Sequence, residues 1–165
     1  MTQIRWKESF EVVGLIAIVA SLVFVGYQIR QDRVIARSEL AAGTAETLLS
    51  IQEVMADPEH ARVYAKMLDH PEDLSVEEML QINRTLQMVS TLFFRECYLT
   101  DRGVFVECEG LIRSHMPLYF GNKYAQAWWK ESYMKPLLPN WVSEEIARLD
   151  PDTELQRLEK IKEGL

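Results

Sequence analysis

The longest apolar segment of the chain lies close to its N-terminus. From Val12 to Tyr27 it reads VVGLIAIVASLVFVGY without a charged residue, and Phe10 and Ile29 extend it to about twenty positions. At 1.5 Å per residue, a helix of about this length spans roughly 30 Å, the thickness of the hydrocarbon core of a bilayer. Trp6 and Phe10 flank one end and Tyr27 the other, where interfacial aromatic residues are expected.

Two other interpretations of this segment fit the sequence less well. A signal peptide needs a small-residue cleavage site after a short apolar core, but Ile18-Val19-Ala20 is followed by further apolar residues. A core helix is rarely apolar on all sides in so small a protein. We therefore predict an interfacial segment over residues 1–9 and a transmembrane helix over residues 10–29, which makes the chain a single-pass membrane protein.

The helical pattern continues beyond the apolar segment. No proline or turn cluster lies between Ile29 and Asp57, so we predict a membrane-emergent helix over residues 30–56. Apolar residues recur every seven positions along it, at Val34, Ala41, Leu48 and Met55. This stripe predicts packing against the rest of the chain, and a parallel dimer through it remains open.

Residues 57–165 predict a helical soluble domain that packs on residues 30–56. Asp57-Pro58 has the pattern of an N-cap before a first-turn proline, Ser75 and Glu78 have capping-box spacing, and Gly103 is a candidate left-handed cap. The expected helices cover 59–69, 75–101, 104–115, 123–135, a turn from Trp141 to Asp150, and 154–163. The predicted fold class is all-α: an N-terminal transmembrane helix continuing into a long helix, with four to five shorter helices packed on its distal part.

The apolar spacing also predicts which side chains form the core. In the central helix the inward positions step by three and four, at Met79, Ile82, Leu86, Val89, Phe93 and Cys97, and a wider face adds Leu80, Met88, Leu92, Phe94 and Tyr98. The next helix is expected to bury Phe105, Cys108, Leu111 and Ile112.

The charge is distributed unevenly. The net charge of −7 divides into +1 over residues 1–40 and −8 over the remainder, and an acidic soluble domain argues against nucleic-acid binding. Arg30, Arg33 and Arg37 share one helical face just after the span, where they either contact anionic lipid headgroups or only extend towards water. They outnumber Arg5 and Lys7 on the other side, which favours a cytoplasmic C-terminal domain.

Candidate chemistry is sparse. Cys97 and Cys108 are too few for a disulfide framework; one bridge between them is geometrically possible, but free thiols are favoured in a cytoplasmic setting. A metal site could combine both cysteines with His115, although a packed thiol and a boundary histidine explain them more simply. Asp57 precedes His60 by three residues, and we expect it to cap the helix rather than to bind a metal ion with His60. We predict no catalytic, cofactor-binding or metal-binding residue, and therefore no enzyme.

Interaction surfaces are the remaining candidates. Ala17 and Ser21 form one small-xxx-small pair in the span, of the kind that allows close packing of membrane helices. Trp128, Trp129 and Trp141 form an aromatic group, and adjacent tryptophans on a helix cannot both face the same core. An exposed tryptophan there would suit a protein interface, while coverage of the pair by the Trp141 segment is the structural alternative.

The order of these features resembles a broad bacterial family of small single-span membrane proteins of unknown function. The resemblance rests on short motifs: Tyr-Gln-Ile-Arg-Gln after the apolar span, Asp-Pro-Glu at 57–59, the tandem tryptophans 128–129 and Leu-Pro-Asn-Trp at 138–141. It covers nearly the whole chain. It implies the same topology and brings no activity or active site.

These observations lead to three hypotheses about function. The first is a membrane-anchored helical interaction protein without catalytic activity, either an accessory subunit of a membrane complex or a homo-oligomer, with membrane lipids and a protein as partners. The second is a membrane-anchored ligand-binding sensor, with a pocket lined by the helix of Phe93 and Tyr98. The third, an enzyme without a recognisable motif, would require titratable groups that converge in a pocket.

Overall fold

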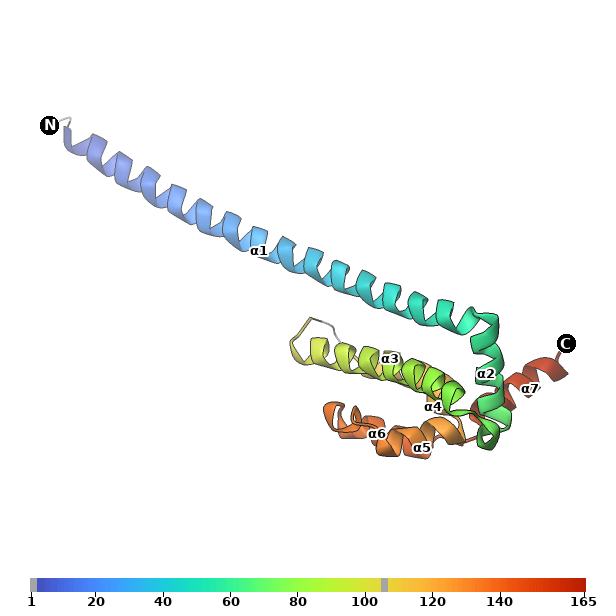
Figure 1. The fold of residues 1–165 in the computed structure, drawn as a ribbon. Helices are drawn as coiled ribbons and strands as arrows, with labels where there is room; N and C mark the ends of the chain where they lie inside the picture. Colours follow the sequence, from blue (N-terminus) through green and yellow to red (C-terminus); the bar gives the residue numbers. More distant parts are fainter. Residues whose placement is uncertain (1–2, 105–106) are drawn as a thin grey trace. The chain divides into compact units, whose positions relative to one another are not determined.

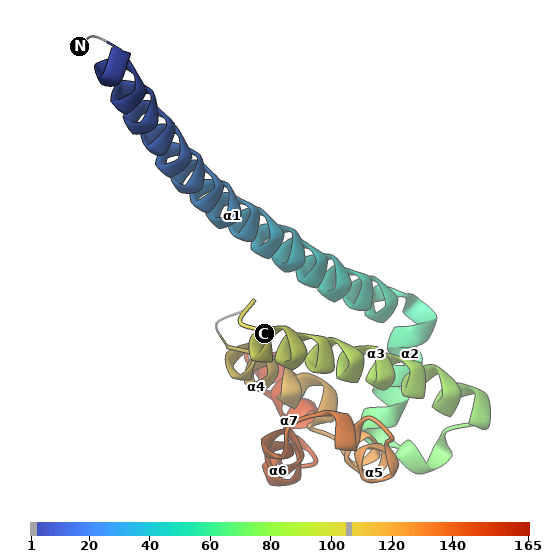
Figure 2. The same ribbon diagram turned by 90° about the vertical axis from the view of Figure 1, so that its left-hand side faces the viewer.

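The structure, a computed structural model, describes the backbone of residues 3–104 and 107–165 and the side chains of residues 10–104 and 107–165. Within these residues the chain forms seven α-helices and two short 3-10 helices and no strand (Figures 1 and 2). The predicted all-α fold class is therefore confirmed, and the other six α-helices are shorter than the first. The chain divides into two units, Met1–Gly43 and Thr44–Leu165.

Helix α1 (Gln3–Ala56) is one continuous helix, as the absence of a helix breaker predicts. Between Phe10 and Ile29 its large apolar side chains are exposed. Moving one such side chain from water into an apolar environment is favourable by about 1.5–3 kcal/mol. The helix has the length and composition of a membrane span.

The second unit, called the soluble unit below, begins with the last turns of α1. Helix α2 (Pro58–Asp69) and the 3-10 helix η1 (Pro71–Asp73) lead to the long helix α3 (Val76–Asp101). The predicted caps are confirmed: Asp57 Oδ1 accepts hydrogen bonds from the backbone N–H groups of Glu59 and His60, and Ser75 and Glu78 form a capping box. Lys66 Nζ donates to Glu78, and this bond together with the Ser75 backbone N–H lowers the pKa of Glu78 to about 2.

Four further α-helices complete the soluble unit. They are α4 (Glu109–Phe120), α5 (Lys123–Glu131), α6 (Asn140–Arg148) and α7 (Thr153–Glu163), with the 3-10 helix η2 (Lys135–Leu137) before α6. Helix α4 contacts α3, α5, α6 and α7 and is therefore the centre of the packing (Figure 2). Phe93 of α3, Phe120 of α4 and Trp129 of α5 bring three helices together in one aromatic core.

Three predicted helix boundaries are wrong and one predicted turn is confirmed. Gly103 has a φ of 69°, the left-handed conformation expected of it. The following helix begins at Glu109 instead of Val104 and continues through Pro117 to Phe120. Proline costs that helix one backbone hydrogen bond, but continuing the helix buries Tyr119 and Phe120 in the core. Helix α5 ends at Glu131, four residues earlier than predicted.

The predicted core of α3 is correct in part. Ile82, Leu86, Val89, Phe93 and Cys97 are buried, and Leu92 of the wider face is buried as well. Phe94 is half-buried, whereas Met79, Leu80, Met88 and Tyr98 are exposed. Apolar composition therefore assigned Leu80, Met88 and Tyr98 to the core wrongly. Of the residues predicted inward in the next helix, Ile112 is buried and Cys108 and Leu111 are half-buried; Phe105 lies outside the described residues.

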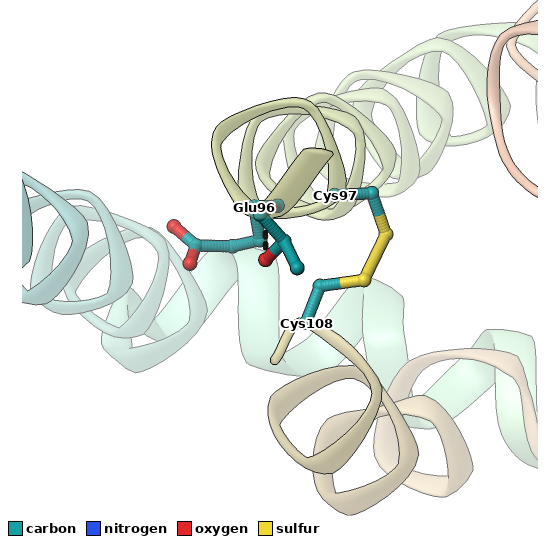
Figure 3. The surroundings of a disulfide bond; sticks show 4 residues. Glu96, Cys97 and Cys108 are labelled. Atoms are coloured by element: carbon teal, nitrogen blue, oxygen red, sulfur yellow. Dashed lines mark hydrogen bonds between the residues drawn. A yellow bond between two sulfur atoms is a disulfide. The ribbon is translucent and has the colours of Figure 1, made fainter. Parts of the chain in front are cut away.

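Cys97 and Cys108 form a disulfide, and the prediction of free thiols is wrong. The bond joins the last turns of α3 to the residue that precedes α4, with the two Cα atoms 5.1 Å apart (Figure 3). The same bond removes both thiolates from the metal site considered with His115. Glu96 leaves α3 in a different direction from Cys97 (Figure 3), and its carboxylate accepts a buried hydrogen bond of 2.6 Å from Thr44 Oγ1 of α1.

Candidate functional site

Two adjoining depressions follow helix α3 on its uncovered side. The first has a volume of about 620 Å³ and is lined by Val54, Asp57, His60, Glu77, Leu80, Gln81, Arg84, Thr85 and Met88. The second, of about 490 Å³, is lined by Thr47, Arg84, Gln87, Met88, Thr91, Leu92 and Arg95. Because both include Arg84 and Met88, they form one groove, called the α3 groove below.

The walls of the α3 groove come from two helices. One wall consists of the last turns of α1, with Thr47 and Val54, and the other is the stripe of α3 from Glu77 to Arg95. At 1.5 Å per residue the stripe is about 27 Å long. Hydrogen bonding of Arg95 Nη1 to Thr47 Oγ1, at 3.4 Å, connects the two walls near one end.

Exposed apolar side chains form the middle of the groove. Leu80 is 58% exposed and Met88 is 36% exposed, and the buried Leu92 lies beneath the second depression. Long apolar side chains exposed on a continuous stripe are typical of surfaces that bind other molecules. The groove is therefore a candidate binding site.

His60 is held in the wall of the first depression by a complete set of hydrogen bonds. Gln81 Nε2 lies 2.9 Å from His60 Nδ1, and Thr85 Oγ1 lies 3.2 Å from His60 Nε2. With the Gln81 amide donating to Nδ1, the proton of a neutral imidazole is on Nε2 and is donated to Thr85 Oγ1. The Thr85 hydroxyl then donates to the Gln81 backbone carbonyl, 3.4 Å away. The network suits a neutral ring and engages both ring nitrogens.

Burial lowers the pKa of His60, and the nearby Asp57 carboxylate only partly opposes this shift. The unfolded chain therefore binds a proton more readily than the folded chain at this residue. The stability contributed by His60 is fully present above the unfolded pKa of 6.5, and it is lost progressively as the pH falls towards the lowered folded pKa.

We expect the wild-type chain to lose stability between pH 7.5 and pH 5.5, and the variant His60→Gln to lose less over the same range. At pH 7.5 the variant should itself be less stable by about 1–2 kcal/mol, because the bonds to Gln81 and Thr85 are altered. Thermal unfolding of the full chain in nanodiscs measures both effects. His70→Gln is the control, since His70 lies on the surface. An equal pH dependence of the wild type and His60→Gln would contradict this assignment.

Charge is separated along the α3 groove. Glu77 and Asp57 lie at one end, and the Asp57 carboxylate already caps α2. From Arg84 to Arg95, the described residues that line the groove include two arginines and no carboxylate. Arg84 is exposed and makes no ion pair with any residue that the structure describes. The exposed Arg84 therefore gives this half of the groove a positive charge.

The residues that the sequence singled out as candidates lie elsewhere. Trp129 is 3% exposed and donates through Nε1 to Ser143 Oγ at 3.2 Å, while Trp128 is half-buried against Phe120. Trp141 is also half-buried, and the Arg113 guanidinium lies 5.4 Å from the centre of its ring. All three contribute to the packing of the soluble unit, and their role at an interface stays a prediction.

The candidates in the first unit are all exposed on α1. Ala17 and Ser21 share a shallow depression of about 300 Å³ with Ile18, Leu22 and Val25. Ser21 Oγ donates to the Ala17 backbone carbonyl at 2.8 Å, so its hydroxyl is satisfied within the helix. Arg30, Arg33 and Arg37 are exposed on the following turns. Their contacts with membrane helices and lipid headgroups stay predictions.

Sequence reasoning missed the α3 groove because its apolar residues were assigned to the core. Leu80 and Met88 widen the apolar face predicted for α3, and only the arrangement of the neighbouring helices leaves them uncovered. One signal was present: Arg84 and Arg95 interrupt the wide apolar face, and a charge there is costly when buried. That interruption marks the face as open.

No family model, curated protein or solved structure matches this chain. The resemblance to a bacterial family of small single-span proteins therefore stays a prediction from its motifs. The described residues contain no group of three or more His, Cys, Asp and Glu side chains that could hold a metal ion.

Proposed function

We propose that this chain is a membrane-anchored helical interaction protein without catalytic activity, and that its soluble unit binds a protein partner through the α3 groove. The observation that carries the proposal is the continuous stripe of α3 on which Leu80 and Met88 stay exposed. Burying such side chains against a partner contributes the apolar area on which protein association depends. An accessory subunit of a membrane complex fits this arrangement.

A membrane-anchored ligand-binding sensor is the second candidate. The depression beside His60, at about 620 Å³, is within the size range of small-molecule sites, about 300–1,000 Å³. It is lined by the first half of α3, whereas Phe93 is buried and Tyr98 lies beyond the groove. Both ring nitrogens of His60 are engaged within the protein, which favours a role in shaping the wall over direct chemistry.

We also propose that α1 spans a membrane, and that Arg30, Arg33 and Arg37 lie at headgroup level. Two observations favour opposite sides of the membrane for the soluble unit. The arginines after the span exceed the cations before it by one, which favours a cytoplasmic soluble unit. The Cys97–Cys108 disulfide favours an oxidising compartment instead. Because an excess of one cation is small, we propose that the soluble unit lies on the oxidising side.

Co-purification of the full chain in a mild detergent tests the binding function. We expect one membrane protein to co-elute at fixed stoichiometry, and the variant Leu80→Asp to reduce its yield by roughly tenfold, because an unpaired carboxylate would be buried in the interface. Leu137→Asp is the matched control, since Leu137 is 52% exposed and lies outside the groove.

Each outcome of this experiment discriminates between the hypotheses. A partner lost in Leu80→Asp and retained in Leu137→Asp supports the proposal. A particle that contains this chain alone argues against an accessory subunit and leaves a homo-oligomer or a solitary sensor. A partner retained equally by both variants places the interface away from the α3 groove.

A further inference from the structure

A second uncovered surface lies between α2 and α7. Figure 1 shows α7, drawn in red, beside α2 at one end of the soluble unit. Between the two helices is a depression of about 460 Å³, called the α7 groove below. It shares no lining residue with the α3 groove. The lining residues that matter here are Ala61, Ala65 and Leu68 of α2 and Leu158, Glu159 and Lys162 of α7.

Helix α7 is packed in the soluble unit through its first turn. Glu154 is 3% exposed and accepts hydrogen bonds from the Arg157 guanidinium, whereas every residue from 156 to 163 is exposed. A helix of 11 residues is marginal in water by itself, because its few hydrogen bonds hardly offset the cost of nucleation. Contact with a further helix therefore stabilises the last two turns of α7.

The exposed part of α7 has an apolar stripe. Leu158 is 42% exposed and Ile161 is 52% exposed. They are three residues apart and therefore lie on the same side of the helix. Across the α7 groove, Ala61 and Ala65 are exposed one turn apart on α2. Such short side chains let a further helix approach α2 closely, so the surface has the shape of a site for one helix.

Two opposite charges indicate which helix that is. Glu159 and Lys162 both line the α7 groove and therefore flank Leu158 on the same side. No described residue forms an ion pair with either of them. When two α7 helices pair antiparallel about a twofold axis, the order of residues is reversed, and Glu159 of each copy faces Lys162 of the other. Nearly the same register places Leu158 of each copy against Ile161 of the other.

We propose that the α7 groove is the interface of a symmetric dimer, in which α7 of one copy lies antiparallel against α7 of a second copy of this chain. Burial of Leu158 and Ile161 in both copies supplies the apolar contact. The two reciprocal pairs of Glu159 and Lys162 set the direction and register of the helices. This interface goes beyond the proposed function, because it leaves the α3 groove free for a partner protein.

A charge swap tests the reciprocal pairing. Full-length chains with donor or acceptor fluorescent proteins fused before Met1 are mixed in phosphatidylcholine vesicles, and energy transfer measures the dimer. Glu159→Lys and Lys162→Glu should each raise the dissociation constant by roughly tenfold, because symmetry places every like-charge contact twice in the interface. The double variant Glu159→Lys, Lys162→Glu should return to within about twofold of the wild type, because it restores both pairs.

Lys160→Glu is the matched control for Lys162→Glu. Lys160 is exposed and lies about 200° around the helix from Leu158, on the opposite side of α7. Energy transfer should be unchanged in Lys160→Glu. An equal effect of Lys160→Glu and Lys162→Glu, or a double variant no better than the single ones, overturns the proposal. Absence of energy transfer in the wild type overturns it as well.

The variant Leu158→Asp separates this interface from other sites of association. It should raise the dissociation constant by roughly tenfold, because a carboxylate would be buried between the two helices. Energy transfer that persists in Leu158→Asp overturns the proposal and, if Leu80→Asp abolishes it, places the second copy in the α3 groove. A co-purified protein that is lost in Leu158→Asp, without energy transfer in the wild type, assigns the α7 groove to another partner and also overturns the proposal.

Discussion

Replacing Phe120 by alanine is expected to lower the free energy of unfolding of the soluble unit by about 4 kcal/mol. The Phe120 side chain is 0% exposed, and its ring centre lies 6.2 Å from that of Phe93 and 5.6 Å from that of Trp129. Removing the ring leaves a cavity between α3, α4 and α5 that these rigid aromatic neighbours cannot fill.

Chemical denaturation of the full chain in nanodiscs, followed by tryptophan fluorescence, measures this loss. Leu137→Ala is the control, because an exposed leucine outside the groove should change the stability by less than about 0.5 kcal/mol. A loss of less than about 1 kcal/mol in Phe120→Ala would mean that the aromatic core is not assembled as described.

Removing the disulfide is expected to have the second largest effect. In the double variant Cys97→Ser, Cys108→Ser the free energy of unfolding should fall by about 3 kcal/mol, because the unfolded chain is no longer constrained by a closed loop. The bond spans a sequence separation of 11 residues. Reduction of the wild type with dithiothreitol should produce the same loss, and the double variant should not respond to dithiothreitol.

The same cysteines decide the orientation in the membrane. If the soluble unit lies in an oxidising compartment, a membrane-permeant maleimide should leave Cys97 and Cys108 unlabelled in intact cells until a reductant is added. Alkaline phosphatase fused after Leu165 should then be active. Free thiols together with an inactive phosphatase would place the soluble unit in the cytoplasm, as the arginine balance predicts.

Helix ends were predictable wherever the signal lies within a few residues. The Asp57 and Ser75 side chains cap the N–H groups two or three residues later, and Gly103 adopts the left-handed conformation that other residues avoid. Continuity of α1 was predictable for the same reason, because only a local helix breaker could have interrupted it.

Predictions failed where distant segments compete with local preference. Pro117 is a helix breaker by its own chemistry, yet α4 continues past it because Phe120 is then buried against Phe93 and Trp129. The bond between Cys97 and Cys108 likewise depends on how the chain turns between α3 and α4. Neither outcome is encoded in the residues next to the cysteines or the proline.

The same contrast between local signals and contacts of distant segments applies to the candidate site. The sequence by itself determined the long apolar helix, the caps and the all-α class, because hydrophobic length, capping and turn chemistry act between near neighbours. Only the tertiary structure decided which face of α3 is covered, and therefore that Leu80, Arg84 and Met88 line a groove. Two faces of a helix can be equally apolar, and which of them is buried depends on the helices that pack against it.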